Sequence, residues 1–226
     1  MKPRLLDLFC GAGGAAMGYH RAGFEVVGVD IKPQPHYPFE FHQADALTFP
    51  LDGFDAIHAS PPCQPFSRAG HLMRAQGGST SEPDLVEPTR RRLVASGLPW
   101  VMENVKGSPL LNPLELCGST FGLRVRRHRL FESSAWIAAA GPCRHREQGK
   151  PVGVYGSMGD RIKGVDRATG RQVTGGHTAT SVSDAQDAMG IDWMPRWSEL
   201  KLAIPPVMTE HIGRQLIAAI DAERVA

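Results

Sequence analysis

The stretch that most constrains the fold is Ser60-Pro61-Pro62-Cys63-Gln64-Pro65-Phe66-Ser67. Its prolines fix the backbone angle φ and lack an amide donor, so neither a helix nor a central strand can pass through Cys63. The residues before it, 54–59, predict a short buried strand. Cys63 is therefore expected on a stiff turn at the carboxyl end of a strand, where open α/β sheets bind their ligands. Free thiols are often buried structural residues, but the flanking prolines favour a functional role.

The segment after this turn, residues 67–78, is basic and rich in glycine. Arg68, His71 and Arg74 lie among three glycines there. This composition is typical of a loop that closes over a substrate.

The composition is that of an ordinary soluble globular protein, with 226 residues of which 42% are hydrophobic and 21% charged. This length fits one large domain, or one domain with a small appendage. The formal net charge is only +2. Any binding to nucleic acid must therefore depend on local arginine clusters, which occur at 90–92, 124–129 and 144–146.

The four cysteines, at positions 10, 63, 117 and 143, form no CxxC pair and follow no regular spacing. We therefore expect free thiols, no bound metal and a reducing, cytoplasmic setting. Cys143 and His145 could bind a metal only with partners that the sequence does not identify. No apolar stretch has the length of a signal peptide core or a membrane span, so we expect no membrane association.

The first part of the chain predicts a strand, a glycine turn and a helix, at residues 5–9, 10–14 and 15–23. Such a turn lets the backbone approach a ligand, and the helix N-terminus offers free N–H groups. Residues 25–30 predict a second strand that ends in Asp30, a position suited to ribose hydroxyls. The turn lacks the GxGxxG spacing of dinucleotide-binding proteins, which argues against NAD.

Two later strands carry polar groups at their ends. Residues 100–105 predict a buried strand with Glu103-Asn104 near its end, where a carboxylate is costly unless it has a partner or a role. A salt bridge or a cap is the alternative for Glu103. Arg127 and Arg129 lie on one face of a basic strand and could hold a phosphate or a base edge, although a solvated sheet edge remains the alternative.

The rest of the chain predicts helices at 87–96, from 183 and at 209–225, the last strongly amphipathic. Residues 133–180 show no periodicity that would support a core of their own. We therefore divide the chain into a main domain at 1–132, a loop-rich insert at 133–180 and a segment at 181–226 that returns to the main domain.

Four motifs in order resemble those of the DNA cytosine-5 methyltransferases, as in a compact bacterial or phage-type member. They are Asp7-Leu8-Phe9-Cys10-Gly11-Ala12-Gly13-Gly14, Pro61-Pro62-Cys63-Gln64-Pro65-Phe66-Ser67, Glu103-Asn104-Val105 and Arg127-x-Arg129. Ala203-Ile204-Pro205-Pro206 and Gly213 resemble the C-terminal motif of that family. The resemblance covers roughly residues 5–131 and 181–220.

The resemblance implies an α/β class I methyltransferase fold, which is a Rossmann-like, mostly parallel sheet with helices on both faces. It also implies S-adenosylmethionine as the methyl donor, S-adenosylhomocysteine as its product and double-stranded DNA as the substrate. Residues 1–132 would then form the catalytic domain and 133–180 a small target-recognition insert. We expect a monomer that is cytoplasmic and associated with the nucleoid when it is bound to DNA.

The chemistry of this reaction independently requires these residue types. Cytosine C5 is a poor nucleophile until a thiolate adds to C6, and Cys63 is the credible thiol. A protonated Glu103 would neutralise the charge that develops towards N3, with Asn104 positioning the acid or the base. By the resemblance, Arg127 and Arg129 would hold the cytosine carbonyl or a phosphate, and their charge could lower the pKa of the thiol.

A stacked base cannot present C6 to a thiol, so the reaction requires the cytosine to flip out of the duplex. The loop at 67–78 is the candidate for closing behind the flipped base. For the donor, the resemblance implies contacts from Phe9, Gly11, Ala12, Gly13, Asp30, Ile31, Asp45 and Pro61. Asp45 would accept from the adenine amino group, although it could equally be a simple turn residue.

Val125, Lys201 and Leu202 depart from the family's pattern. The insert is also unusually short for a target-recognition segment. A small insert can contact few base edges, so we expect a recognition sequence of about two to four base pairs, or relaxed specificity.

Three alternatives remain. An RNA cytosine-5 methyltransferase of the transfer-RNA type shares these motifs, but the chain lacks the Cys-Phe-Thr tripeptide of those relatives. A non-catalytic nucleic-acid-binding module would retain the scaffold but would not need Cys63, Glu103 and both arginines together. A nucleotide-binding oxidoreductase has no role for the Pro-Pro-Cys-Gln stretch.

Overall fold

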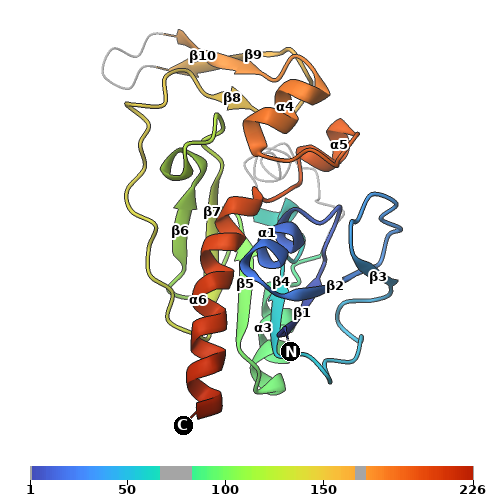
Figure 1. Cartoon of the computed structure of the whole chain (residues 1–226). Coiled ribbons are helices and arrows are strands. Elements are labelled where there is room, and N and C mark those ends of the chain that lie inside the picture. Colours follow the sequence, from blue (N-terminus) through green and yellow to red (C-terminus); the bar gives the residue numbers. More distant parts are fainter. Residues whose placement is uncertain (1, 67–82, 166–171, 226) are drawn as a thin grey trace.

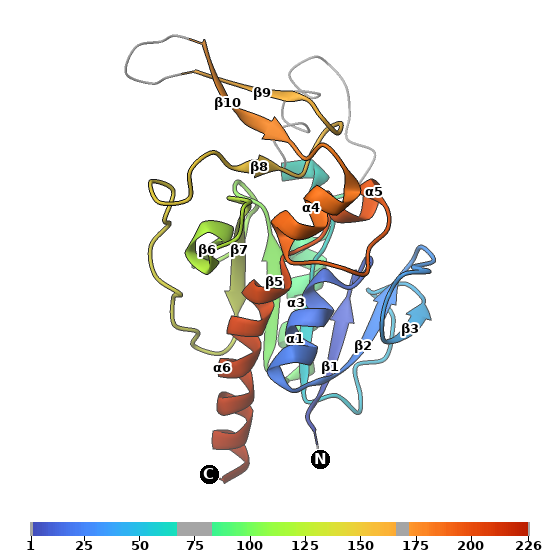
Figure 2. The ribbon, with the colours of Figure 1, turned by 45° about the horizontal axis from the view of Figure 1, so that its top comes forward.

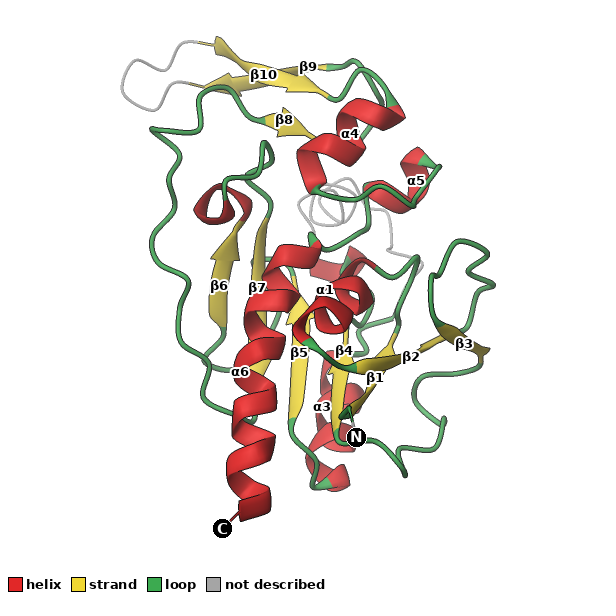
Figure 3. Cartoon of the chain, viewed as in Figure 1, coloured by secondary structure: helices red, strands yellow, loops and turns green. Residues whose placement is uncertain are grey.

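A computed structural model of the chain describes residues 2–66, 83–165 and 172–225. The loop at 67–78, which the sequence predicts to close over a substrate, lies outside these residues. Figure 1 shows the path of the chain, and Figure 3 its helices and strands.

Seven strands form one sheet in the order β3-β2-β1-β4-β5-β7-β6 (Figure 1). The strands β3, β2, β1, β4 and β5 run parallel to one another, whereas β7 is antiparallel to both of its neighbours, β5 and β6. The bounds are β1 Arg4–Leu8, β2 Glu25–Asp30, β3 Glu40–Gln43, β4 Ala56–Ala59, β5 Trp100–Asn104, β6 Leu114–Cys117 and β7 His128–Ser133. The mostly parallel sheet expected from the sequence is thus confirmed.

Helices cover both faces of this sheet, as Figure 2 shows. The helices α1 (Gly14–Ala22) and α6 (Pro206–Val225) pack on one face, and α3 (Val86–Ser96) packs on the other. Two short 3₁₀ helices, η1 (Gln64–Phe66) and η2 (Gly118–Phe121), follow β4 and β6. None of the described helices combines the length and the apolar character that a membrane span requires.

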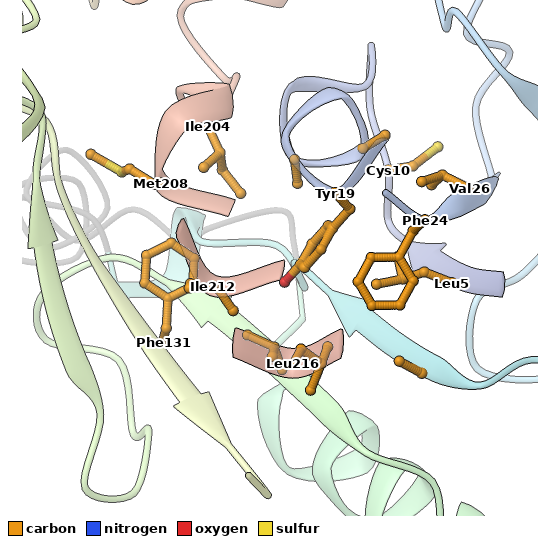
Figure 4. Packing of buried hydrophobic residues seen from close by; sticks show 14 of the residues in the cluster. Leu5, Cys10, Tyr19, Phe24, Val26, Phe131, Ile204, Met208, Ile212 and Leu216 are labelled. Atoms are coloured by element: carbon orange, nitrogen blue, oxygen red, sulfur yellow. The ribbon is translucent and has the colours of Figure 1, made fainter. Parts of the chain in front are cut away.

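The alternation of side chains along β1 explains why both faces need a cover. Leu5 packs in one core cluster with Tyr19 of α1 and with residues of α6, which Figure 4 shows. Leu6 and Leu8 pack in a second cluster with α3. Successive side chains of a strand point to opposite faces, so an almost uninterrupted apolar strand is buried on both sides.

The insert contains more regular structure than the sequence predicts. The strands β8 (Val152–Gly153), β10 (Gln172–Thr178) and β9 (Arg161–Val165) form a second sheet in that order. Glycines inside β9 and β10 hide the alternating pattern of a strand. Figure 1 places this sheet, α4 (Val182–Met189) and α5 (Trp197–Leu200) beyond the carboxyl ends of the parallel strands.

The insert shares a core with the C-terminal segment, because Val152 and Val154 pack with Met189 and Leu200. Ala12, from the glycine turn, belongs to the same cluster. The second sheet is therefore attached to the turn that leads into α1.

Candidate active site

A cleft of about 390 Å³ opens at the carboxyl ends of the parallel strands. It brings together residues that the sequence separates widely. Of the predicted site residues, its lining includes Phe9, Gly11, Ala12, Asp30, Ile31, Pro61, Cys63, Glu103 and Arg129. The predicted thiol, acid and one arginine thus share one cavity with most of the predicted donor contacts.

Cys63 lies on the stiff turn that the prolines predict. The turn is fixed on both sides, because Ser60 N–H donates to Leu8 O at 3.1 Å and Asn104 Nδ2 donates to Pro61 O at 3.0 Å. Phe66 N–H donates to Cys63 O at 3.0 Å, which closes the first turn of η1. The half-buried thiol is therefore held over the ends of β1 and β5.

The pKa of the Cys63 thiol is raised, first by burial and then by the neighbouring Glu103. Arg129 and, more weakly, Arg127 act in the opposite direction but do not reverse the shift. The two arginines therefore favour the thiolate as the sequence predicts, and further stabilisation must come from elsewhere when the thiol ionises.

Glu103 is buried and faces Arg129, whose Nε lies 2.8 Å from Glu103 Oε1. The contact is an ion pair without the geometry of a hydrogen bond, because Oε1 has no hydrogen-bond partner among the described residues. Burial raises the pKa of Glu103, although Arg129 and a hydrogen bond from Ser60 oppose the rise. Glu103 therefore holds a proton more readily than an ordinary glutamate, which suits a general acid.

Ser60 connects Glu103 to two buried side chains that the sequence analysis did not single out. Ser60 Oγ lies 2.9 Å from His58 Nε2, and His58 Nδ1 lies 3.0 Å from Tyr19 Oη. Burial lowers the pKa of His58 to about 3, so the imidazole is neutral at neutral pH. A polar residue inside the buried strand at 56–59 is the sequence signal that could have found it.

The hydrogen bonds that link Tyr19, His58, Ser60 and Glu103 all run in the same direction. If Ser60 donates to the Glu103 carboxylate, its oxygen accepts from His58 Nε2–H, and His58 Nδ1 then accepts from Tyr19. The hydroxyl of Tyr19, the Nε2–H of His58 and the hydroxyl of Ser60 therefore each donate to the next group, and the last of them donates to the candidate acid.

Arg127 and Asn104 lie outside the lining of the cleft. Arg127 Nη atoms donate to backbone carbonyls of Leu200, at 3.2 Å, of Lys201, at 2.9 Å, of Val154, at 2.5 Å, and of Ala203. Asn104, besides binding Pro61, accepts from Val105 N–H through Oδ1 at 2.9 Å. Both residues therefore position the site's backbone in this structure.

The other end of the cleft is built from the glycine turn and the end of β2. Phe9 has a φ of 58°, an uncommon value for a residue with a side chain, at the sharp turn after β1. Asp30 accepts from Gly11 N–H at 3.1 Å and from Lys32 N–H at 2.9 Å, and Ile31 beside it is 66% exposed. A carboxylate with spare lone pairs beside an exposed apolar side chain matches a ribose and a purine base.

Two predicted donor contacts, Gly13 and Asp45, lie outside the lining of the cleft. Gly13 has a φ of 85° and precedes α1, where a Cβ would lie 2.8 Å from Pro38 Cδ. Asp45 is exposed and accepts from Leu47 N–H at 2.8 Å, which is the turn arrangement that the sequence left open.

Asp7 is a lining residue that the donor prediction did not include. Its carboxylate is fully buried, and neither oxygen has a hydrogen-bond partner among the described residues. Burial, and next the charge of Asp30, raise the pKa of Asp7, while the nearby N–H of Ala16 opposes the rise. An unpaired buried carboxyl at a cleft is costly to fold unless a cation or a donor group binds there.

The C-terminal segment closes one side of the cleft through Ser198, Glu199, Leu202, Ala203 and Ile204. Two contacts hold this side in place besides the hydrogen bonds from Arg127. His36 Nδ1 lies 2.8 Å from Glu199 Oε1, and Trp193 Nε1 donates to Ala12 O at 2.9 Å.

Part of the chain is similar in sequence to known proteins. Residues 3–108 match the family described as C-5 cytosine-specific DNA methylase. The Type II methyltransferase M.AquIA of Picosynechococcus sp. is 33% identical over 129 residues, covering 47% of this chain and 50% of that protein. The chain thus spans about half the length of that curated relative.

Two solved structures share the fold over nearly the whole chain. A prophage-encoded protein of E. coli superposes with a TM-score of 0.63 at 15% identity, covering 97% of this chain and 99% of the other. The S. pombe Dnmt2 methyltransferase superposes with a TM-score of 0.60 at 14% identity, covering 97% of this chain and 100% of the other. Together with the sheet order, these likenesses confirm a class I methyltransferase fold.

Proposed function

We propose that the chain is a DNA cytosine-5 methyltransferase that methylates C5 of cytosine in duplex DNA, and the match of residues 3–108 to that family supports this proposal. The observation that carries this proposal is the meeting of Cys63, Glu103 and Arg129 in the cleft that Asp30 and Gly11 line at its other end. One end can hold a pyrimidine and the other a nucleoside.

The cleft suits S-adenosylmethionine, whose sulfonium centre would supply the methyl group. Asp30 would bind the ribose hydroxyls, and Ile31 would pack against the adenine. The N-terminus of α1 offers free N–H groups to the donor's carboxylate. The unpaired Asp7 carboxyl offers a partner for a positively charged donor.

Cys63, as a thiolate, would add to C6 of the cytosine and form a carbon–sulfur bond. Glu103 would supply its proton towards N3, which neutralises the charge that the addition creates. C5 then has the electron density to take the methyl group. Loss of the C5 proton to water or another base allows the thiolate to leave C6.

Arg129 is suited to two tasks in this scheme. Its ion pair with Glu103 orients the acid, and its charge favours the Cys63 thiolate. We propose that Arg127 does not contact the substrate but holds the wall of the cleft in place, because its guanidinium donates to carbonyls of the C-terminal segment.

The cytosine would have to flip out of the duplex to reach Cys63, because a stacked base does not expose C6 to a thiol. The short insert at 133–180 is the proposed reader of the target sequence, in a chain acting as a monomer. A reader of this size supports recognition of about two to four base pairs.

The test is a covalent trap. Wild-type protein and Cys63→Ser are incubated with the methyl donor and a DNA duplex that contains 5-fluorocytosine, whose fluorine cannot leave as a proton does. Wild-type protein should remain attached to the duplex through denaturing electrophoresis. Cys63→Ser should form no adduct, and its methylation rate should fall by at least about a thousandfold.

A second assay identifies which nucleic acid is the substrate. The protein is incubated with tritiated methyl donor and either duplex DNA or RNA of matched sequence, and the label in each is measured. Label in DNA supports the proposal, whereas label in RNA alone would assign the chain to the RNA-methylating alternative. Absence of any adduct and of any label would favour the non-catalytic binding module. Sequencing of the methylated DNA would then give the recognition sequence.

A further inference from the structure

Four side chains with metal-binding atoms converge at the sheet edge formed by β6 and β7. They are Cys117, His128, Cys143 and His145, and their ligand atoms all lie within 4.8 Å of one another. None of the four lines the cleft that contains Cys63. We propose that they form a structural zinc site.

The fold brings these residues together from two places. Cys117 ends β6 and His128 begins β7, and the two residues are direct partners in the antiparallel ladder. Cys143 and His145 come from the loop that follows β7. Their loop is docked by contacts that need no metal, because Arg144 N–H donates to Ser119 Oγ at 3.1 Å and Thr120 Oγ1 donates to Pro142 O at 3.1 Å.

Two of the ligand–ligand distances are close to those of a tetrahedral centre. Cys117 Sγ lies 3.3 Å from His145 Nε2, and Cys143 Sγ lies 3.4 Å from His128 Nε2. Zinc bond lengths in a tetrahedron place sulfur and nitrogen ligands about 3.6 Å apart. These two pairs would therefore move apart by only a few tenths of an ångström to bind an ion, and all four ligand atoms already lie within 4.8 Å of one another.

The orientation of the imidazoles also fits. The rings of His128 and His145 are nearly perpendicular, at 83°, with centroids 5.2 Å apart. Each ring places its Nε2 beside a cysteine sulfur of the cluster, His145 beside Cys117 and His128 beside Cys143.

The donor set indicates which metal binds. Two thiolates and two imidazoles in a tetrahedron are typical of structural zinc, whereas catalytic zinc sites leave one position for water. Ser119 Oγ, 3.1 Å from Cys117 Sγ, can donate a hydrogen bond to the bound thiolate. Cys143 is exposed, which gives an ion a path into the site.

Two oxygen atoms of the described residues lie beside these ligands, Arg126 O at 2.9 Å from Cys117 Sγ, which donates to it as a thiol, and a Glu115 carboxylate oxygen beside His128. Glu115 Oε1 lies 3.6 Å from His128 Nε2, but it also binds Lys106 Nζ at 2.8 Å. The site therefore has four ligands of its own without Glu115.

The ion would fasten the long loop between β7 and β8 to the edge of the main sheet. It would also fix the start of β7, which carries Arg129 one residue after His128. This proposal replaces the expectation of no bound metal. That expectation came from the irregular spacing of the cysteines in the sequence, which does not show that strand pairing brings Cys117 next to His128.

The test measures metal in protein purified under reducing conditions without added chelator. Elemental analysis and native mass spectrometry should find about one zinc ion per wild-type chain. Cys143→Ser and His145→Ala should lose it. Cys63→Ser and His42→Ala, which change a cysteine and a histidine elsewhere, should keep it.

Cobalt provides a second readout that does not depend on how well a variant folds. Wild-type protein stripped of zinc and loaded with Co(II) should show the absorption of a tetrahedral ion together with a thiolate-to-cobalt charge-transfer band. The proposal is overturned if wild-type protein binds neither ion, if cobalt shows an octahedral spectrum without thiolate, or if Cys143→Ser retains full zinc. It is also overturned if Cys117 and Cys143 form a disulfide in the reduced preparation.

Discussion

Ser60 is the residue through which buried groups can control the candidate acid. It lies between Glu103 and His58, and His58 in turn contacts Tyr19. Neither His58 nor Tyr19 lines the cleft. The hydrogen bond from Ser60 stabilises the charged form of Glu103 and so limits the rise that burial causes in its pKa.

We predict that Ser60→Ala raises the pKa of Glu103 further, because the carboxylate loses a donor while its burial remains. Titration of isotopically labelled Glu103 by NMR should show its midpoint at higher pH than in the wild-type protein. The methylation rate should fall by about ten- to a hundredfold, since the acid loses an orienting contact.

Ser133→Ala is the matched control, because Ser133 Oγ also binds β5, at Trp100 O and 3.2 Å, but at the opposite end of the strand. Its Glu103 titration should equal that of the wild-type protein. An unchanged midpoint in Ser60→Ala would exclude a role for the Tyr19–His58–Ser60 chain in setting the acid.

The contact between α1 and α6 is the packing that brings the C-terminal segment back to the main sheet. Thr209 Oγ1 donates to Ala15 O at 2.9 Å, and a Cβ at Gly213 would lie 2.8 Å from Ala22 Cβ. A Cβ at Gly18 would overlap Pro206 O and Thr209 Oγ1. The two helices therefore approach closely because glycines face the partner helix.

Gly18→Ala should destabilise the protein although alanine is the better helix former, because the added methyl group forces α1 and α6 apart. Overpacking of this kind costs about 1–3 kcal/mol in the free energy of unfolding. Urea unfolding followed by circular dichroism measures it. Arg21→Ala, at an exposed position of the same helix, should change the free energy by less than about 0.5 kcal/mol. Equal stability of Gly18→Ala and the wild-type protein would contradict the packing argument.

Across the whole molecule, Arg127 joins the main domain, the insert and the C-terminal segment. Arg127 belongs to the main domain at 1–132. Its guanidinium donates to the carbonyls of Val154 in the insert and of Leu200 and Lys201 near the C-terminus. Burial and the nearby Arg129 lower its pKa to about 9, so it remains charged at neutral pH. One side chain thus holds the wall of the cleft that Leu202 and Ala203 form.

Arg127→Lys should weaken binding of the methyl donor, because a single ammonium group cannot reach carbonyls that a guanidinium spans. We expect the dissociation constant for S-adenosylmethionine to rise about tenfold, which corresponds to about 1.4 kcal/mol. Isothermal titration calorimetry measures it, and hydrogen exchange should increase at residues 198–204.

Arg124→Lys controls for the loss of a guanidinium, since Arg124 is exposed and pairs with Asp184 at 3.0 Å. It should bind the donor as the wild-type protein does. If Arg127→Lys also binds normally, then the carbonyl contacts do not support the wall of the cleft, and a direct contact with DNA becomes the better account of Arg127.

The sequence by itself determined the local features of this protein. The proline turn under Cys63, the glycine turn before α1 and the strand that carries Glu103 follow from steric limits and side-chain periodicity, which act between residues close in the chain. Their common position at the carboxyl ends of parallel strands followed from the fold class.

Only the tertiary structure decided which distant groups touch. The hydrogen bonds from Tyr19 through His58 to Ser60, the carbonyls that occupy Arg127 and the pairing of Cys117 with His128 all depend on sheet order and register. Apart from the contact between His58 and Ser60, these contacts join residues of different elements, and their formation is governed by how whole elements pack. Local patterns carry no record of that packing, which is why the candidate thiol and acid were predictable and the hydrogen bonds from Tyr19 through His58 to Ser60 were not.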